Sequence, residues 1–186
     1  EGLRFIDSLY SHAALDRLAT CSQVERIGGA GDGGKLICTD DIPQNECVVY
    51  SLGSRNDFSF DKAVVERFGC QVHTFDCTVK PLPEKRILQG VSFYPWCVGD
   101  KDEMKVIDTD GKLGQYYTLS TIQRKLQHQT VDLLKMDIER HEFAVIQTLN
   151  AGNSPRQISF EVHLNNAHKM WGGPVSEVEW TSMWAT

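Results

Sequence analysis

Residues 47–57 constrain the fold more than any other part of the chain. This stretch begins with an apolar, β-branched run that predicts a buried strand, and the run stops at Gly53. A helical pattern follows at once over residues 59–68, and residues 71–76 form a second strand pattern that ends in Asp76. A strand, a glycine turn, a helix, a strand and an acid, in this order, open a nucleotide-binding α/β domain.

The glycine content of the turn indicates which nucleotide such a domain would bind. A dinucleotide site needs the pattern G-x-G-x-x-G, because backbone must approach a pyrophosphate closely. This turn has Gly53 alone, followed by Ser54 and Arg55. S-adenosylmethionine has no pyrophosphate and needs one tight turn, with an acid that holds the ribose hydroxyls. Asp76 follows Gly53 at about the 20-residue spacing expected of that acid. An ordinary βα turn with a loop-capping Asp is the alternative interpretation.

The composition is that of a single globular domain. The 186 residues are 41% hydrophobic, and no apolar run is long enough for membrane insertion. A net charge of -6 argues against a nucleic-acid-binding surface. Six cysteines permit disulfides, buried free thiols are the alternative, and the absence of C-x-x-C argues against a zinc site. The composition does not distinguish the secretory pathway from the cytoplasm.

The most glycine-dense segment, residues 26–35, resembles a phosphate-binding loop only superficially. Gly29, Gly34 and Lys35 match its spacing, but Leu36 stands where a Ser or Thr should hold magnesium. The following residues also read as a strand and not as a helix. Two interpretations remain open: a lid or wall of a site, and a hairpin with glycines at positive φ.

Strand and helix patterns alternate along the rest of the chain, which predicts a doubly wound, mostly parallel, Rossmann-like sheet. Residues 100–114 read as polar turns. We expect five strands in the order 3-2-1-4-5, with the sheet truncated after the fifth strand, whose exposed outer edge would allow self-association. The single domain 1–186 would divide into a leading helix (3–18) and glycine-rich hairpin within 1–46, a core at 47–163 and a tail at 164–186. The remaining strand patterns lie at 91–98, 131–139 and 158–163, and the remaining helices at 119–126 and 143–149. Pro95 interrupts the first of these strands, which should therefore be an edge strand or a bulged strand.

Functional side chains belong at the carboxyl ends of such strands. The cofactor-binding candidates are Ser51, Gly53, Ser54, Asp76, Cys77, Gly99, Asp100 and Asp137. The catalytic candidates are His163, Asp137 and Glu139. His163 is preferred as the base, because the unperturbed pKa of histidine lies near 6.5. The acids could instead hold a divalent cation, although we prefer a metal-free site, and Glu139 could instead stabilise a helix N-terminus.

Several segments occur in the order known from one group of enzymes. The chain resembles the methyltransferase-like protein 24 family and, more distantly, FkbM-type methyltransferases, over roughly residues 24–165. The resemblance implies a class I methyltransferase fold, S-adenosylmethionine as cofactor, and O-methylation of a carbohydrate or small hydroxylated acceptor. The matching segments are residues 31–34, 49–53, 75–76, 134–139 and 161–163, of which Lys135 to Glu139 is the most specific.

Three features depart from the family pattern. Arg140 and His141 replace Gly-Ala, Lys35 stands where an aromatic is usual, and five strands are visible where the fold has seven. These departures keep open a second hypothesis, a non-catalytic methyltransferase-like binding module. A third hypothesis, an NAD-dependent oxidoreductase, is disfavoured by the single glycine at Gly53.

Overall fold

The computed structural model describes residues 21–31, 33–40, 42–80, 89–107, 111–139, 141–161 and 183–184. The expected leading helix over residues 3–18 and the expected base His163 lie outside these residues. Nearly all of the expected core is described.

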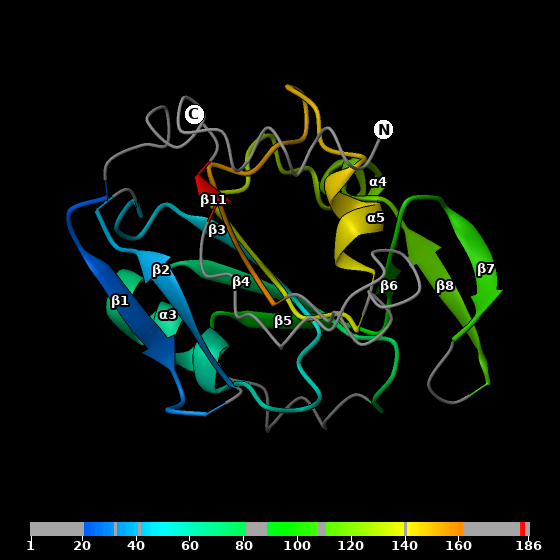
Figure 1. Ribbon diagram of the computed structural model, residues 1–186, viewed down its shortest axis with the longest axis horizontal. Helices are drawn as coiled ribbons and strands as arrows, with labels where there is room; N and C mark the ends of the chain where they lie inside the picture. Colours follow the sequence, from blue (N-terminus) through cyan, green and yellow to red (C-terminus); the bar gives the residue numbers. More distant parts are fainter. Residues whose placement is uncertain are drawn as a thin grey trace, which may run out of the picture.

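The central sheet has the expected α/β topology. Its strand order is β11-β10-β9-β3-β4-β5, and the five strands from β10 to β5 are parallel (Figure 1). This confirms the doubly wound, mostly parallel sheet and the order 3-2-1-4-5. Its strands are β3 (Val48–Leu52), β4 (Gln71–Phe75), β5 (Val91–Tyr94), β9 (Leu133–Met136), β10 (Gln157–Phe160) and β11 (Met183–Trp184).

One short strand extends the expected sheet at one edge, and the other edge is formed by the expected strand. At one edge, β11 pairs antiparallel with Gln157 and Ile158, so the outer edge of the fifth strand is covered there instead of exposed. At the other edge, β5 is an edge strand as expected, but Pro95 ends it. The chain then enters β6 (Cys97–Val98), which belongs to a second sheet.

The two faces of the central sheet have different covers (Figure 1). On one face, α3 (Ser59–Phe68) and the antiparallel hairpin of β1 (Val24–Gly28) and β2 (Gly34–Cys38) share an apolar cluster with the sheet. The hairpin interpretation of the glycine-rich segment is thereby confirmed, with Gly28 at φ +98°. On the other face, α4 (Leu119–Leu126) and α5 (Glu142–Ile146) pack on a second cluster.

A small second sheet occupies the segment that reads as polar turns. In it, β8 (Leu113–Tyr117) lies between β6 and β7 (Glu103–Val106). The turn expectation for residues 100–114 is therefore wrong. The strand is only four residues long and all four are exposed, so the alternation of Glu, Met, Lys and Val over residues 103–106 marks no buried face within this polar segment.

All six cysteines form disulfides, so the alternative of buried free thiols is wrong. The bonds are Cys21–Cys38, Cys47–Cys70 and Cys77–Cys97. The second joins the starts of β3 and β4, and the third joins the residue that follows Asp76 to β6. Of the helices in the described part of the chain, none combines the length and the apolar character needed to cross a bilayer.

The face under α4 contains two neighbouring histidines, of which His73 is buried. His73 is 8% exposed, and its ring centroid lies 4.5 Å from that of His128. Tyr94 Oη lies 3.1 Å from His73 Nδ1, and Tyr50 Oη lies 2.9 Å from His128 Nδ1. Burial, together with the nearby His128, lowers the pKa of His73 to about 4. Burial also lowers the pKa of His128. The native state therefore favours both imidazoles in the neutral form.

This pair predicts a loss of stability in mild acid. Between pH 6.5 and pH 4 the unfolded chain binds a proton at His73 that the native state does not, so the free energy of unfolding falls as pH falls. For His73 alone the loss is about 2.5 kcal/mol at pH 4.5. Urea unfolding at pH 7 and pH 4.5 should show it, and His73→Gln should reduce the pH dependence. An equal pH dependence in both proteins would contradict the assignment.

Candidate functional site at the carboxyl ends of the strands

The register of the parallel strands brings the candidate site residues to one edge of the sheet. Leu52 is aligned with Phe75 and Met136, and Met136 is aligned with Phe160. The residue that follows each of these strand ends is a glycine or an acid. In spatial order they are Asp76, Gly53, Asp137 and Glu161.

The backbone conformation of Gly53 and the closeness of Asp137 require a glycine at this position. Its φ is +75°, and a Cβ at this position would overlap the carbonyl oxygen of Asp137. The backbone is held closely on both sides, since Gly53 N donates to Phe75 O at 2.9 Å and Asp137 N donates to Leu52 O at 3.0 Å. The tight turn that the sequence predicts is therefore part of the junction of three strands.

Asp76 is buried and binds the turn after Gly53. Its Oδ2 accepts hydrogen bonds from Ser54 N at 2.9 Å, Ser54 Oγ at 3.2 Å and Arg55 N at 2.7 Å. Its Oδ1 accepts from Thr78 N at 2.9 Å and Thr78 Oγ1 at 2.7 Å. Burial alone would raise the pKa of Asp76, but these hydrogen bonds outweigh burial and lower the pKa. Asp76 thus acts as a loop cap, and its ribose-binding role stays a prediction.

The other cofactor-binding candidates occupy three different settings. Ser51 is 1% exposed and lies inside the sheet, behind the turn. Cys77 is bonded to Cys97, so this disulfide brings the loop after β4 next to the segment that contains Gly99 and Asp100. Gly99 is buried and Asp100 is exposed.

A buried lysine, Lys135, lies behind the turn and was not a sequence candidate. It is 7% exposed, and its Nζ donates to the carbonyl oxygens of Leu52, at 3.2 Å, and Gly53. Burial lowers its pKa, and the charges of Asp137 and Asp61 oppose that effect. Burial also raises the pKa of Asp61, which accepts a hydrogen bond from Thr74 Oγ1 at 2.6 Å. A lysine inside an otherwise apolar strand was the signal available in the sequence.

Lys35 brings the glycine-rich hairpin into the site. Its Nζ lies 2.7 Å from Glu161 Oε2 and 3.2 Å from Asp137 Oδ2. Burial alone would lower the pKa of Lys35, but its contacts with Glu161 and Asp137 outweigh burial and raise the pKa. The hairpin therefore borders the strand ends through Lys35, while its expected role as a lid or wall of a binding site stays a prediction.

Two acids near the turn between β9 and α5, Glu139 and Glu142, have different environments. Glu139 is exposed and has a left-handed backbone with φ +51°. Glu142 is fully buried, and its Oε1 accepts a hydrogen bond from Ile138 N at 2.9 Å. Glu142 therefore fixes the turn that follows Asp137, while a catalytic role of Glu139 stays a prediction.

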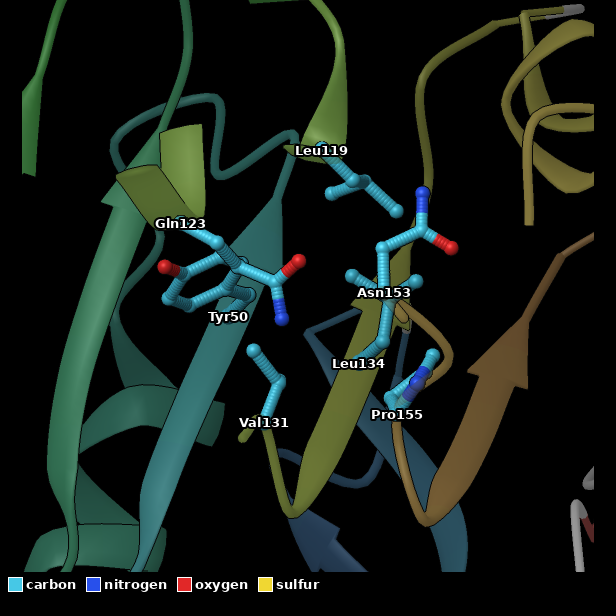
Figure 2. A pocket seen from close by; sticks show the side chains of 7 residues that line it. All are labelled: Tyr50, Leu119, Gln123, Val131, Leu134, Asn153 and Pro155. Carbon is cyan, nitrogen blue, oxygen red and sulfur yellow. The ribbon is translucent and has the colours of Figure 1, made fainter. Parts of the chain in front are cut away.

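The hollow in Figure 2 is separate from the strand-end site. It lies on the α4 face near the starts of β9 and β10, and none of the cofactor-binding or catalytic candidates lines it. Its lining residues are Tyr50, Leu119, Gln123, Val131, Leu134, Asn153 and Pro155.

Comparisons with known proteins show the family of this chain and two of its relatives. The sequence model of a family described as "Methyltransferase domain" matches residues 8–182, and the chain therefore belongs to that family. The probable methyltransferase-like protein 24 of Rattus norvegicus is 27% identical over 179 residues, which are 89% of this chain and 48% of that protein. The probable methyltransferase-like protein 24 of Homo sapiens is 28% identical over 178 residues, 88% of this chain and 46% of that protein. The chain spans about half the length of these curated relatives. No solved structure matches.

The close approach at Gly53 predicts a large effect of adding one methyl group. We expect Gly53→Ala to lower the free energy of unfolding by roughly 3 kcal/mol or more, because it combines a left-handed backbone with overlap of the Asp137 carbonyl. Gly111→Ala is the matched control, since Gly111 has φ +69° and no atom near its Cβ position. The control should lose only about 1–2 kcal/mol. Equal losses in urea unfolding would show that close packing at Gly53 is unimportant.

Proposed function

We propose that this domain is an S-adenosylmethionine-dependent methyltransferase that O-methylates a carbohydrate or another small hydroxylated acceptor. The observation that carries the proposal is the pairing of the Gly53 turn with Asp76, in a chain that belongs to a methyltransferase-domain family. The acid at the end of β4 fixes the N–H groups of the turn at the end of β3. A cofactor that spans these two strand ends would meet an ordered surface.

The charges of the strand ends fit such a cofactor. Asp76, Asp137 and Glu161 contribute carboxylates, and Lys35 and Lys135 contribute ammonium groups. One excess negative charge suits a sulfonium cofactor, which when bound supplies an electrophilic methyl group. The carboxylates of Asp137 and Glu161 are 18% and 25% exposed, so they can accept hydrogen bonds from an acceptor hydroxyl. His163 remains the proposed base.

Asp76 can contact a ribose only by exchanging a partner. A carboxylate offers about four lone-pair sites, and Asp76 already accepts five hydrogen bonds. Among the described residues, the contacts of Oδ1 come from Thr78, two residues along the chain, whereas Oδ2 accepts from Ser54 and Arg55 in the turn. We propose that ribose hydroxyls replace Thr78 Oγ1 at Oδ1 and leave the contacts of Oδ2 intact.

Calorimetric titration with S-adenosylhomocysteine tests the proposed function directly. Wild-type protein should bind it and should not bind NAD. Asp76→Asn should weaken binding about 10- to 150-fold, because charge-assisted hydrogen bonds contribute about 1.5–3 kcal/mol. Asp102→Asn is the matched control, since Asp102 binds Thr118 and Thr121 at the start of α4. No binding by wild-type protein would overturn the proposal, and unchanged affinity in Asp76→Asn would overturn the role of Asp76.

The disulfides provide a second test of where the cofactor binds. Cys77–Cys97 lies beside Asp76 at the carboxyl ends of the strands, whereas Cys47–Cys70 joins the starts of β3 and β4 at the other edge of the sheet. The two bonds close loops of similar length, with sequence separations of 20 and 23 residues respectively. Removing either bond should therefore destabilise the fold similarly, by about 3 kcal/mol. Only the pair Cys77→Ser and Cys97→Ser should weaken S-adenosylhomocysteine binding. Equal affinity in both double variants, measured where both are folded, would place the cofactor elsewhere. Three disulfides are also typical of proteins that work in oxidising compartments.

A further inference from the structure

The carboxylates of Asp137 and Glu161 come from neighbouring strand ends and share one cation. Asp137 follows β9 and Glu161 follows β10, and the two strands are parallel and aligned up to Met136 and Phe160. Lys35 Nζ lies 3.2 Å from Asp137 Oδ2 and 2.7 Å from Glu161 Oε2. Two carboxylates that converge from adjacent strands could hold a divalent cation, and here an ammonium group lies between them.

The strand that carries Lys35 is held in place by hydrogen bonds to its backbone. Two side chains of β10, from Gln157 and Ser159, bind the backbone of β2. Gln157 Oε1 accepts from Cys38 N at 2.9 Å, and Gln157 Nε2 donates to Cys38 O at 3.0 Å. Ser159 Oγ donates to Leu36 O at 3.0 Å. The side chain of Lys35 is only 8% exposed, so its ammonium is part of the packed structure and differs from a mobile surface lysine.

We propose that Lys35 is the resident cation of this site, taking the position that a divalent metal ion would otherwise occupy between Asp137 and Glu161. The inference rests on the proposed function in one respect only: the ammonium would orient the acceptor oxygen there, so that methyl transfer would not require a metal ion. Lys35 is thus a positioning residue, since it holds both carboxylates in place.

Manganese binding tests this assignment without any methyl acceptor. The free Mn²⁺ signal in electron paramagnetic resonance reports binding to wild-type protein, Lys35→Ala, Lys35→Arg, Glu161→Gln and the double variant Lys35→Ala with Glu161→Gln. We expect Lys35→Ala to bind Mn²⁺ about tenfold more tightly than wild-type protein, because two carboxylates lose their cation. The double variant should lose this gain, and Lys35→Arg should behave as wild type. Lys62→Ala is the matched control, because Lys62 pairs with Glu66 on an exposed helix face.

The outcomes separate the resident-cation assignment from the proposed function. Mn²⁺ binding by wild-type protein that is lost in Glu161→Gln would overturn the assignment, as would a folded Lys35→Ala protein with no gain in Mn²⁺ affinity. Thermal unfolding establishes whether each variant is folded, and Lys35→Met provides a second neutral replacement. S-adenosylhomocysteine affinity of wild-type protein should be unchanged by a chelator, and loss with the chelator would also overturn the assignment. Absence of S-adenosylhomocysteine binding under both conditions would instead refute the proposed function and leave the manganese result valid.

Discussion

The strand-end site depends on the buried ammonium of Lys135. Burying a charge costs several kcal/mol unless hydrogen bonds and opposite charges compensate it. Lys135 obtains both, from the carbonyl oxygens of Leu52 and Gly53 and from the nearby carboxylates of Asp61 and Asp137. These partners come from different elements. The interactions of this one ammonium group therefore connect the end of β3, the turn after it and the acid at the end of β9.

A gradient of polarity along the strands makes this arrangement compatible with a buried sheet. On the face that α3 covers, the strands begin with the apolar residues Val49, Val72 and Leu133. Two residues later the same face carries Ser51, Thr74 and Lys135, all buried. The apolar end packs against α3 and the hairpin, and the polar end supports the acids. The core and the site are therefore the two ends of one layer.

The sequence was sufficient for the parts of the fold that follow from local patterns. The Gly53 turn, the helix over 59–68 and the order of the five parallel strands could be predicted, because strand and helix periodicity is local and βαβ connections follow simple rules. The contact of Lys35 with Glu161 spans 126 residues, and no local pattern records it. The strand β7 was missed because it is only four residues long and none of its residues is buried. Asp76 was recognised as a strand-end acid, but its partners depend on how the turn after Gly53 folds.

The same contacts make the site rigid before any ligand arrives. The strands β3 and β4 are joined covalently at their starts by Cys47–Cys70, and the residue after Asp76 is joined to β6 by Cys77–Cys97. Asp76 then fixes the N–H groups of Ser54 and Arg55, and Lys35 fixes Asp137 and Glu161. A ligand that binds to preorganised groups loses less conformational entropy than one that must order them. Disulfides, a loop-capping acid and two buried lysines thus act in the same direction, because each removes a motion that binding would otherwise have to restrict.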